Sequence, residues 1–274
     1  MVLPMKTKAS PRLAAVGFCC ADIYENLDLW YPTGNGIDWG IHLSRMGYPV
    51  SAVSVVGTDA YGEGMKKALS EEGLDISHLR TEPGSTCVTR MELRNGTDRV
   101  HLASVDGVME GYALTEEELA FTAGHDLIHT DLFGCVLSHL PAWRAGGSRI
   151  VMDFSIYSAD PDYHCETLFP HVDYVFFSAD GLDRDLRTWM KEIKGYGPRL
   201  VTATMGEAGS LCYDGQRFYE CGAVKAEKVV NTVGAGDSYI AGFTAGLLQG
   251  LSIPECMHKG AALAAEMVGR FKPY

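Results

Sequence analysis

The sequence predicts an α/β protein with a doubly wound, mostly parallel sheet flanked by helices and a small inserted antiparallel β-lid. Two observations lead to this prediction. Strand-type runs rich in β-branched residues alternate with helix-periodic segments along most of the 274 residues, a pattern typical of a parallel sheet with crossover helices. One stretch breaks the alternation, because two runs of alternating polarity flank an Asn-Gly pair, which favours a tight hairpin turn.

The N-terminal part of the chain follows this alternation closely. Residues 1–11 are expected to be a loose leader, and residues 12–274 are expected to form one domain. The run at 12–24 predicts a single buried strand that carries Asp22 near its far end. The next three segments predict a helix, a strand and a helix, at residues 36–47, 50–57 and 61–73. Both helices end at a glycine, which suits the left-handed position after a helix C-terminus.

The lid is predicted from the stretch TCVTRMELRNGTDRVHLAS, residues 86–104. With Asn95 and Gly96 as a two-residue loop, Glu92 lies opposite Arg99 in the paired strand. A two-stranded hairpin is too small to fold alone, so it must pack on the main domain. We therefore expect a lid over a binding site, built from elements near residues 24–33 and 85–105.

The α/β alternation resumes after the lid. Thr115 followed by Glu118 is a capping-box pattern and predicts the start of a helix. Strand-type runs follow at residues 125–133, 148–155, 172–178 and 199–206, and a further β-type stretch spans residues 209–222. No internal repeat or low-complexity linker interrupts this part of the chain, so one domain is expected.

The composition excludes several classes of function. A formal net charge of -12 without a Lys/Arg cluster argues against nucleic acid as a partner. Apolar runs are broken well before the ~20 residues that a membrane-spanning helix needs. Eight cysteines, without a C-x-x-C spacing or an N-terminal signal sequence, predict reduced thiols. We therefore expect a soluble cytoplasmic protein.

The stretch NTVGAGDSYIAGF, residues 231–243, joins a glycine-rich turn to an apolar, helix-periodic segment. Gly234, Ala235 and Gly236 have minimal side chains, so their backbone N–H groups can approach an anion at the helix start. Asp237 is then open to two interpretations. It either stabilises the helix dipole, by roughly 0.3–1 kcal/mol, or it acts as a chemical reagent beside the anion.

A second glycine-rich turn favours the chemical interpretation. The stretch TMGEAGS places Thr204, Gly206 and Gly209 at the end of a predicted strand, where open parallel sheets bind their ligands. Two such turns in one sheet suit a polyphosphate chain.

Taken in chain order, these motifs resemble the ribokinase-like (PfkB) family of sugar kinases. The resemblance runs over nearly the whole chain and is carried by Asp22, GNGID at 34–38, VGTDAYG at 56–62, TMGEAGS and NTVGAGDSYIAGF. Within this family, the stretches NGTDRV, DGVMEGYALTEEE and HDLIH are most similar to fructoselysine 6-kinases. Each motif is weak alone, whereas the ordered set is specific.

The resemblance implies a ribokinase-like fold and ATP-dependent phosphorylation of a hydroxyl of a small sugar or sugar–amine adduct. Asp237 would be the catalytic base that takes the proton of that hydroxyl, and the turn at 234–236 would hold the charge of the phosphate. By the same resemblance, ATP would contact Thr204, Gly206 and Gly209. The sugar would contact Asp22, Gly34, Asn35, Asp38 and Arg99.

The sugar-binding element departs from the family pattern. The family's Gly-Gly-x-x-x-Asn element corresponds here to Thr33, Gly34 and Asp38. Asp38 therefore has two interpretations that the sequence leaves open. It caps the helix that follows it, or it faces the site and supplies a negative charge for the amine of a sugar adduct.

The metal-binding elements depart from the family pattern as well. Asn231 replaces the first aspartate of the family's DTxGAGD pattern, which leaves dependence on a monovalent cation open. The Asn-x-x-Glu element that the family links to Mg²⁺ is missing, and Asp180 or Asp183 is the candidate substitute. Mg²⁺ is then expected to be carried mainly by the ATP phosphates.

Three classes of function are open at this level. They are an ATP-dependent kinase of a sugar or sugar–amine adduct, a kinase of another sugar or nucleoside (fructose, ribose, adenosine or 2-keto-3-deoxygluconate), and a non-catalytic sugar or nucleotide sensor. The complete GAGD turn argues against the sensor. The resemblance further implies a homodimer formed through the lids.

Overall fold

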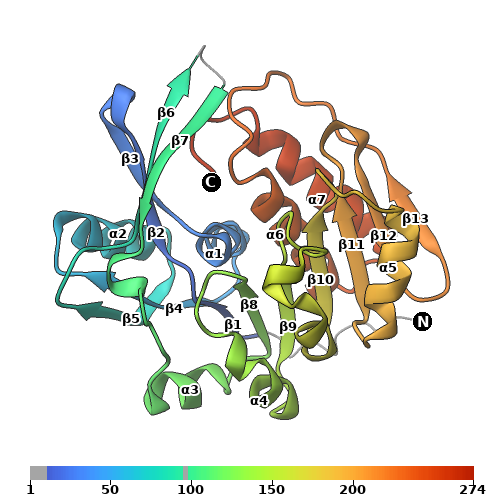
Figure 1. Cartoon of the computed structure of the whole chain (residues 1–274), viewed down its shortest axis with the longest axis horizontal. Coiled ribbons are helices and arrows are strands. Elements are labelled where there is room, and N and C mark those ends of the chain that lie inside the picture. Colours follow the sequence, from blue (N-terminus) through green and yellow to red (C-terminus); the bar gives the residue numbers. More distant parts are fainter. Residues whose placement is uncertain (1–10, 95–97) are drawn as a thin grey trace.

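The structure, a computed structural model, describes residues 11–94 and 98–274 and contains two sheets (Figure 1). A nine-stranded sheet has the order β13-β12-β11-β10-β9-β8-β1-β4-β5, and a four-stranded sheet has the order β3-β2-β6-β7. The strands are β1 Leu13–Val16, β2 Cys20–Tyr24, β3 Leu29–Thr33, β4 Val50–Gly57, β5 Asp75–Glu82, β6 Val88–Arg94, β7 Asp98–Val105, β8 Leu127–Asp131, β9 Arg149–Asp153, β10 Tyr174–Ser178, β11 Leu200–Thr204, β12 Ser210–Tyr213 and β13 Phe218–Cys221.

Helices cover both faces of the large sheet, as the sequence predicts. They are α1 Asn35–Arg45, α2 Ala60–Glu71, α3 Glu116–Thr122, α4 Leu140–Ala145, α5 Leu186–Gly195, α6 Ala235–Leu248 and α7 Ile253–Met267. In β1, Leu13 and Ala15 pack in one hydrophobic core with α1, α2, α6 and α7. Ala14 and Val16 point to the other core, which contains side chains of α3, α4 and α5. This alternation along one strand is what a sheet buried on both faces requires.

The large sheet is parallel from β5 to β11 and ends in an antiparallel hairpin of β12 and β13. The four strand-type runs predicted between residues 125 and 206 are β8, β9, β10 and β11. Among the described residues, no helix combines the length and apolar character needed to cross a bilayer.

The single strand predicted at 12–24 is wrong. The structure has two strands there, and they belong to different sheets, because β1 lies in the large sheet and β2 in the small one. The chain turns between them at Gly17, which has a φ of +117°. A Cβ at this position would lie 2.8 Å from the Cα of Gly134, so the turn needs glycine. Asp22 consequently lies in the lid sheet rather than at the end of a central strand.

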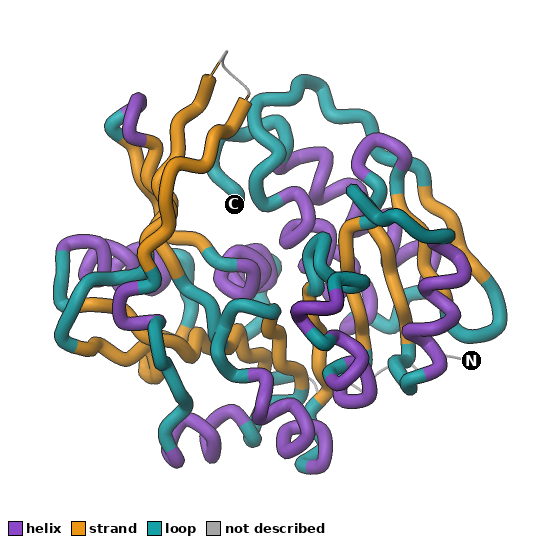
Figure 2. Tube along the Cα trace, in the orientation of Figure 1, coloured by secondary structure: helices purple, strands orange, loops and turns teal. Residues whose placement is uncertain are grey.

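The small sheet contains the predicted lid segments and projects from the helix-covered sheet (Figures 1 and 2). The pairs β2–β3 and β6–β7 are antiparallel, and β2 joins β6 in parallel. The predicted hairpin register is wrong by one residue, because Glu92 pairs with Val100 and Leu93 pairs with Arg99. Arg94 pairs with Asp98, so three residues separate the strands instead of two. The predicted Asn95-Gly96 loop lies outside the described residues.

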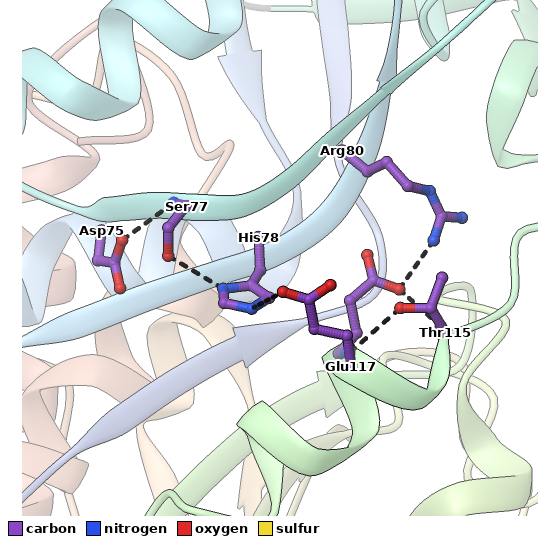
Figure 3. Close-up of polar contacts among 7 residues, drawn as sticks. Asp75, Ser77, His78, Arg80, Thr115 and Glu117 are labelled. Atoms are coloured by element: carbon purple, nitrogen blue, oxygen red, sulfur yellow. Dashed lines mark hydrogen bonds and ion pairs between the residues drawn. The ribbon is translucent and has the colours of Figure 1, made fainter.

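Helix α3 is fixed across the edge strand β5 by polar contacts (Figure 3). The predicted capping box is confirmed, because the Thr115 hydroxyl accepts from the Glu118 N–H and the Glu118 carboxylate accepts from the Thr115 N–H. The same carboxylate accepts from Arg80 Nη1 at 2.8 Å. His78 Nε2 lies 3.9 Å from Glu117 Oε1. These contacts cover one edge of the large sheet, away from the predicted site.

The C-terminal segment after α7 runs between the lid sheet and α6 (Figure 1). The Tyr274 hydroxyl donates to the Pro32 carbonyl of β3 at 3.0 Å. His42 of α1 lies 3.1 Å from the Pro273 carbonyl oxygen. Phe271 packs on Tyr24 of β2, with ring centroids 5.0 Å apart. The segment therefore ties the lid to the helices that flank the predicted site.

Candidate active site

The predicted catalytic turn opens helix α6. Gly234 is the N-cap residue, with a φ of +73°, and no side chain caps the helix. A Cβ on Gly234 would collide with Pro273 of the C-terminal segment, so both the backbone conformation and the packing require glycine there. No atom lies within 4 Å of a Cβ built on Gly236. The space beside Gly236 therefore leaves room for an anion at the start of α6, although the Ala235 N–H already donates to the Thr232 carbonyl at 3.3 Å.

Asp237 is half-buried in the first turn of α6. Burial raises its pKa well above the ordinary aspartate range, and the negative charges of Asp153 and Asp131 raise it further. If Asp237 only complemented the helix dipole, two acidic neighbours would not stabilise its negative charge. The raised pKa is what a proton acceptor of a reaction near neutral pH needs, which favours the chemical interpretation of Asp237.

Asp131 and Asp153 are site residues that the sequence reasoning missed. They are register partners at the carboxyl ends of the parallel strands β8 and β9. Strand alternation puts Asp131 on the same face as Leu127, and Asp153 on the same face as Val151, which is the face covered by α1 and α6. The available signal was an aspartate at the last inward position of each apolar run, the place where open α/β sheets bind ligands.

The two carboxylates differ in their partners. Asp153 is half-buried, and its oxygens accept from the Ser155 N–H and the Asn35 amide, each at 2.9 Å. Asp131 is fully buried, and its Oδ1 accepts from the Phe133 N–H at 2.7 Å. Its Oδ2 has no hydrogen-bond partner among the described residues. Asn35, predicted to contact the sugar, thus holds Asp153 in place from the start of α1.

The helix-cap interpretation of Asp38 is wrong. Gly34 is the N-cap of α1, and Asp38 lies within the helix with 1% of its surface exposed. Its Oδ2 accepts from the Thr33 hydroxyl at 2.7 Å, and its Oδ1 has no partner among the described residues. Burial raises the pKa of Asp38, and the charge of Asp237 raises it further. Asp38 is therefore a buried carboxylate that is hydrogen-bonded to Thr33 and close enough to Asp237 for their charges to interact.

The remaining predicted sugar contacts lie near this group with different roles. Asp22 is 6% exposed in β2 of the lid sheet, and the Cys20 thiol lies 3.9 Å from its Oδ1. Gly34 has a φ of +139°, and a Cβ there would lie 2.5 Å from the Phe18 carbonyl oxygen. Position 34 therefore requires glycine because of how closely the backbone packs there. The side chain of Arg99 lies outside the described part of the chain.

The second glycine turn lies at the carboxyl end of β11. Thr204 is the last residue of that strand. Gly206 is exposed, with a φ of +54°, and a Cβ added there would meet no atom within 4 Å, so it leaves room for a ligand. Gly209 has a φ of +94°, and a Cβ there would collide with the Cys221 carbonyl. Gly209 therefore allows the β12–β13 hairpin to pack, and nothing in the structure points it at a ligand.

A cavity of about 390 Å³ lies beyond this turn, between residues 224–228 and helix α7. Lys225, Lys228 and Arg270 line it. The N–H of Val230 donates to the Val268 carbonyl at 2.7 Å, which holds the segment leading to the catalytic turn against the end of α7. The cavity is large enough for a planar heterocycle. Its lining also includes Glu227 and Glu266, and Arg270 pairs with Glu266, so the charges around it are mixed.

The family comparison agrees with this geometry. The family model described as pfkB family carbohydrate kinase matches residues 31–274. The chain belongs to this family. It is 38% identical to the fructoselysine 6-kinase of Shigella flexneri over 93% of the chain and 97% of that protein. It is also 30% identical to the fructosamine kinase FrlD of Bacillus subtilis over 94% of the chain and 91% of that protein.

The fold of this pfkB kinase is that of ribokinase. The structure of Arabidopsis thaliana ribokinase complexed with ribose and ATP matches with a TM-score of 0.81 at 18% identity, covering 95% of this chain and 93% of that chain. Family membership makes the protein an ATP-dependent sugar kinase. The start of α6 and Asp237 have a geometry that suits phosphoryl transfer.

The candidate Mg²⁺ residues do not form a metal site in the pfkB kinase. Asp180 and Asp183 are exposed in the loop after β10. Among the described residues, no three or more His, Cys, Asp or Glu side chains are grouped so that they could hold a metal ion.

Asn231 lies buried beside the catalytic turn and the C-terminal segment. Its amide Nδ2 donates to the Phe271 carbonyl at 2.9 Å, and its Oδ1 accepts from the Val233 N–H at 3.1 Å. The side chain is 3% exposed. Both the nitrogen and the oxygen of the Asn231 side-chain amide are thus already hydrogen-bonded.

Asp131 is expected to lower the stability of the pfkB kinase at neutral pH. Burial raises its pKa to about 7, with a smaller contribution from Asp153. Because the folded-state pKa of Asp131 exceeds its unfolded value, the contribution of Asp131 to stability is fully present below about pH 4 and is lost as the pH rises through about 7. We expect Asp131→Asn to raise the free energy of unfolding at pH 8, by up to about 4 kcal/mol, and to change it little at pH 4.

Urea unfolding of both proteins at the two pH values measures this difference. Asp185→Ala is the control, because Asp185 caps α5 by accepting from the Thr188 N–H at 2.8 Å and has a lowered pKa. Loss of this cap should destabilise the protein at pH 8, the opposite sign. Equal stability of wild type and Asp131→Asn at pH 8 would show that the charge of Asp131 is compensated within the folded protein.

Proposed function

We propose that this pfkB kinase phosphorylates the terminal hydroxyl of a sugar–amine adduct of the fructoselysine type, using MgATP. The observation that carries the proposal is the group of carboxylates around Asp237. The charges that act most strongly on Asp237 are those of Asp153 and Asp131, and both are negative. A neutral sugar leaves this negative charge uncompensated, whereas an adduct with a cationic amine offsets it. The named activities of the Shigella and Bacillus relatives support the same class of substrate.

The residues of the site divide the work of phosphoryl transfer. Asp237 accepts the proton of the sugar hydroxyl as that oxygen attacks the γ-phosphoryl group. The N–H groups at 234–236 stabilise the charge on the transferred phosphoryl group. Asp38 and Asp22, from α1 and the lid, accept hydrogen bonds from the sugar hydroxyls. The turn at Thr204 and Gly206 and the cavity beside α7 hold the nucleotide.

A substrate panel tests this proposal. We expect kcat/KM for fructoselysine to exceed that for fructose, ribose, adenosine and 2-keto-3-deoxygluconate by at least about tenfold, since one charge-assisted hydrogen bond contributes about 1.5–3 kcal/mol. ADP release with each compound at fixed MgATP is the measurement. A preference for any of the four other compounds would contradict the substrate class, and ADP release with none of the compounds would favour the sensor.

We further propose that the reaction does not need a monovalent cation. The hydrogen bonds of Asn231 to Phe271 and Val233 support this, because they occupy the groups that would bind one. Replacing K⁺ by tetramethylammonium at constant ionic strength should change kcat less than twofold. A loss of more than tenfold, restored by K⁺, would contradict the proposal.

The oligomeric state and the location in the cell stay predictions. A dimer formed through the lids is supported by two exposed apolar side chains on the edge strand β7, Leu102 and Val105, which are 41% and 48% exposed. Sedimentation velocity decides between monomer and dimer. Cytoplasmic location is supported by free cysteines throughout the described residues.

A further inference from the structure

The five carboxylates of the site differ in how much of their surface is exposed. Asp22, Asp38 and Asp131 have 6%, 1% and 0% of their surface exposed. Asp237 and Asp153 are half-buried. Asp237 is already assigned to the reacting hydroxyl. Asp153 is therefore, after Asp237, the other carboxylate of the site with a substantial exposed surface.

Asp153 is held in a fixed orientation without being neutralised. The Ser155 N–H binds one oxygen and the Asn35 amide binds the other. Both donors are uncharged, and each carboxylate oxygen keeps a lone pair for a further donor. No ion pair in the described part of the chain involves Asp153 or its neighbour Asp131. A positioned carboxylate without a counter-ion is suited to a cationic ligand.

Asp131 gives an independent indication of a missing positive partner. It is the register partner of Asp153 on the adjacent strand and lies on the same face of the sheet. It is fully buried, yet its Oδ2 has no hydrogen-bond partner among the described residues. A buried, unpartnered carboxylate oxygen beside a second carboxylate destabilises the protein unless a ligand offsets the charge.

We propose that Asp153, supported by Asp131, binds the ammonium group of the substrate at the end of the sugar remote from the phosphorylated hydroxyl. This inference rests on the proposed function and names the residue that selects its substrate class. Asp237 and Asp153 come from different elements, α6 and β9, and are close enough for their charges to interact. One hexose chain separates an amine on the first carbon from the terminal hydroxyl, so the two carboxylates take opposite ends of one substrate.

Asp38 and Asp22 are less suited to this role. The Thr33 hydroxyl covers one oxygen of Asp38, and the side chain lies within α1 behind it. Asp22 lies in the lid sheet, where it meets the hydroxyl-bearing part of a sugar bound against Asp237. The charge for the amine, which the sequence reasoning attached to Asp38, therefore belongs to Asp153.

Asp153→Asn tests the inference, because it removes the charge and keeps the shape. We expect kcat/KM for fructoselysine to fall about 10- to 100-fold, the range for losing one charge-assisted hydrogen bond. For fructose, which lacks the amine, the fall in kcat/KM should be at least about tenfold smaller, because any effect of Asp153 on the pKa of Asp237 acts on both substrates alike. Asp153→Glu keeps the charge and should retain part of the preference for fructoselysine. Asp162→Asn is the matched control, since Asp162 is an exposed carboxylate in the loop after β9, and both substrates should be unaffected.

The outcomes separate the inference from the proposed function. Wild-type preference for fructoselysine over fructose tests the function, and the change of that preference in Asp153→Asn tests the residue. Equal losses for both substrates would show that Asp153 only supports the fold or the sugar ring, and unchanged values for both would show that it does not meet the substrate. Calorimetric titration of fructoselysine without ATP gives a second readout, in which Asp153→Asn should raise the Kd by the same factor. An unchanged Kd overturns the inference.

Discussion

Asp237→Asn is expected to lower kcat by about 10² to 10⁴, the range for loss of a general base, while the protein stays folded and binds ATP. Asparagine has the same shape but cannot accept the hydroxyl proton. The native carboxylate has a raised pKa caused by burial and by Asp153 and Asp131, so replacing it with a neutral group removes a repulsion instead of a stabilising contact. Single-turnover phosphorylation after rapid mixing, together with urea unfolding, measures both effects.

The matched control is Asp185→Ala at the start of α5. Asp185 is a true N-cap, whereas α6 has no side-chain cap. Asp185→Ala removes the cap and should lower stability and leave kcat unchanged, the reverse of the result for Asp237→Asn. If Asp237→Asn stayed within threefold of the wild-type rate, the base assignment would fail and the helix-dipole interpretation would stand. Because a base must be deprotonated to act, wild-type kcat/KM should also fall as the pH drops through the raised pKa of Asp237.

The local chemistry of the site could be predicted from the sequence because it depends on short segments. The turn at 234–237 combines small residues, a helix start and a carboxylate within four positions, and no distant residue is needed to read it. The capping box at Thr115 and the glycine ends of α1 and α2 are equally local, and the structure confirms them. The order of the motifs along the chain then indicated the family.

The parts that could not be predicted depend on distant contacts. Asp131 and Asp153 become neighbours only because β8 and β9 pair in parallel, after a crossover through α4. The break between β1 and β2 depends on the close approach of Gly17 to Gly134, more than a hundred residues away. The burial of Asp38 depends on the packing of α1 against the large sheet. A hydrophobic pattern gives strand faces, whereas these positions follow from topology and register.

Topology also explains why the acidic residues converge. Every side chain assigned to the sugar or the proton follows a strand end or begins a helix on one face of the large sheet, apart from Asp22 in the lid. Parallel strands place their carboxyl ends at one edge, and α1 and α6 begin at that edge. Mutual repulsion of these carboxylates lowers the stability of the fold. The arrangement is kept because the same charges act on the substrate.

Gly236→Ala is expected to lower kcat/KM for ATP about 10- to 100-fold without loss of stability. Nothing lies within 4 Å of a Cβ at this position, so the methyl group meets no protein atom and projects into the space where the phosphate approaches the helix start. Removing one donor of an anion hole costs about 10² to 10³ in rate, and a methyl group that holds the phosphate away from the N–H weakens the same contact. Alanine also favours the helix over glycine by roughly 1 kcal/mol, so unfolding should require equal or more urea.

Two further glycine variants separate this effect from general disturbance of the helices. Gly195→Ala in α5 also adds a methyl group in open space, and it should leave the kinetics unchanged. Gly234→Ala should lower both activity and stability, because the N-cap has a φ of +73° and its Cβ would collide with Pro273. If the kinetics of Gly236→Ala matched those of Gly195→Ala, the phosphate would not approach the start of α6, and the charge of the transferred phosphoryl group would have to be stabilised elsewhere.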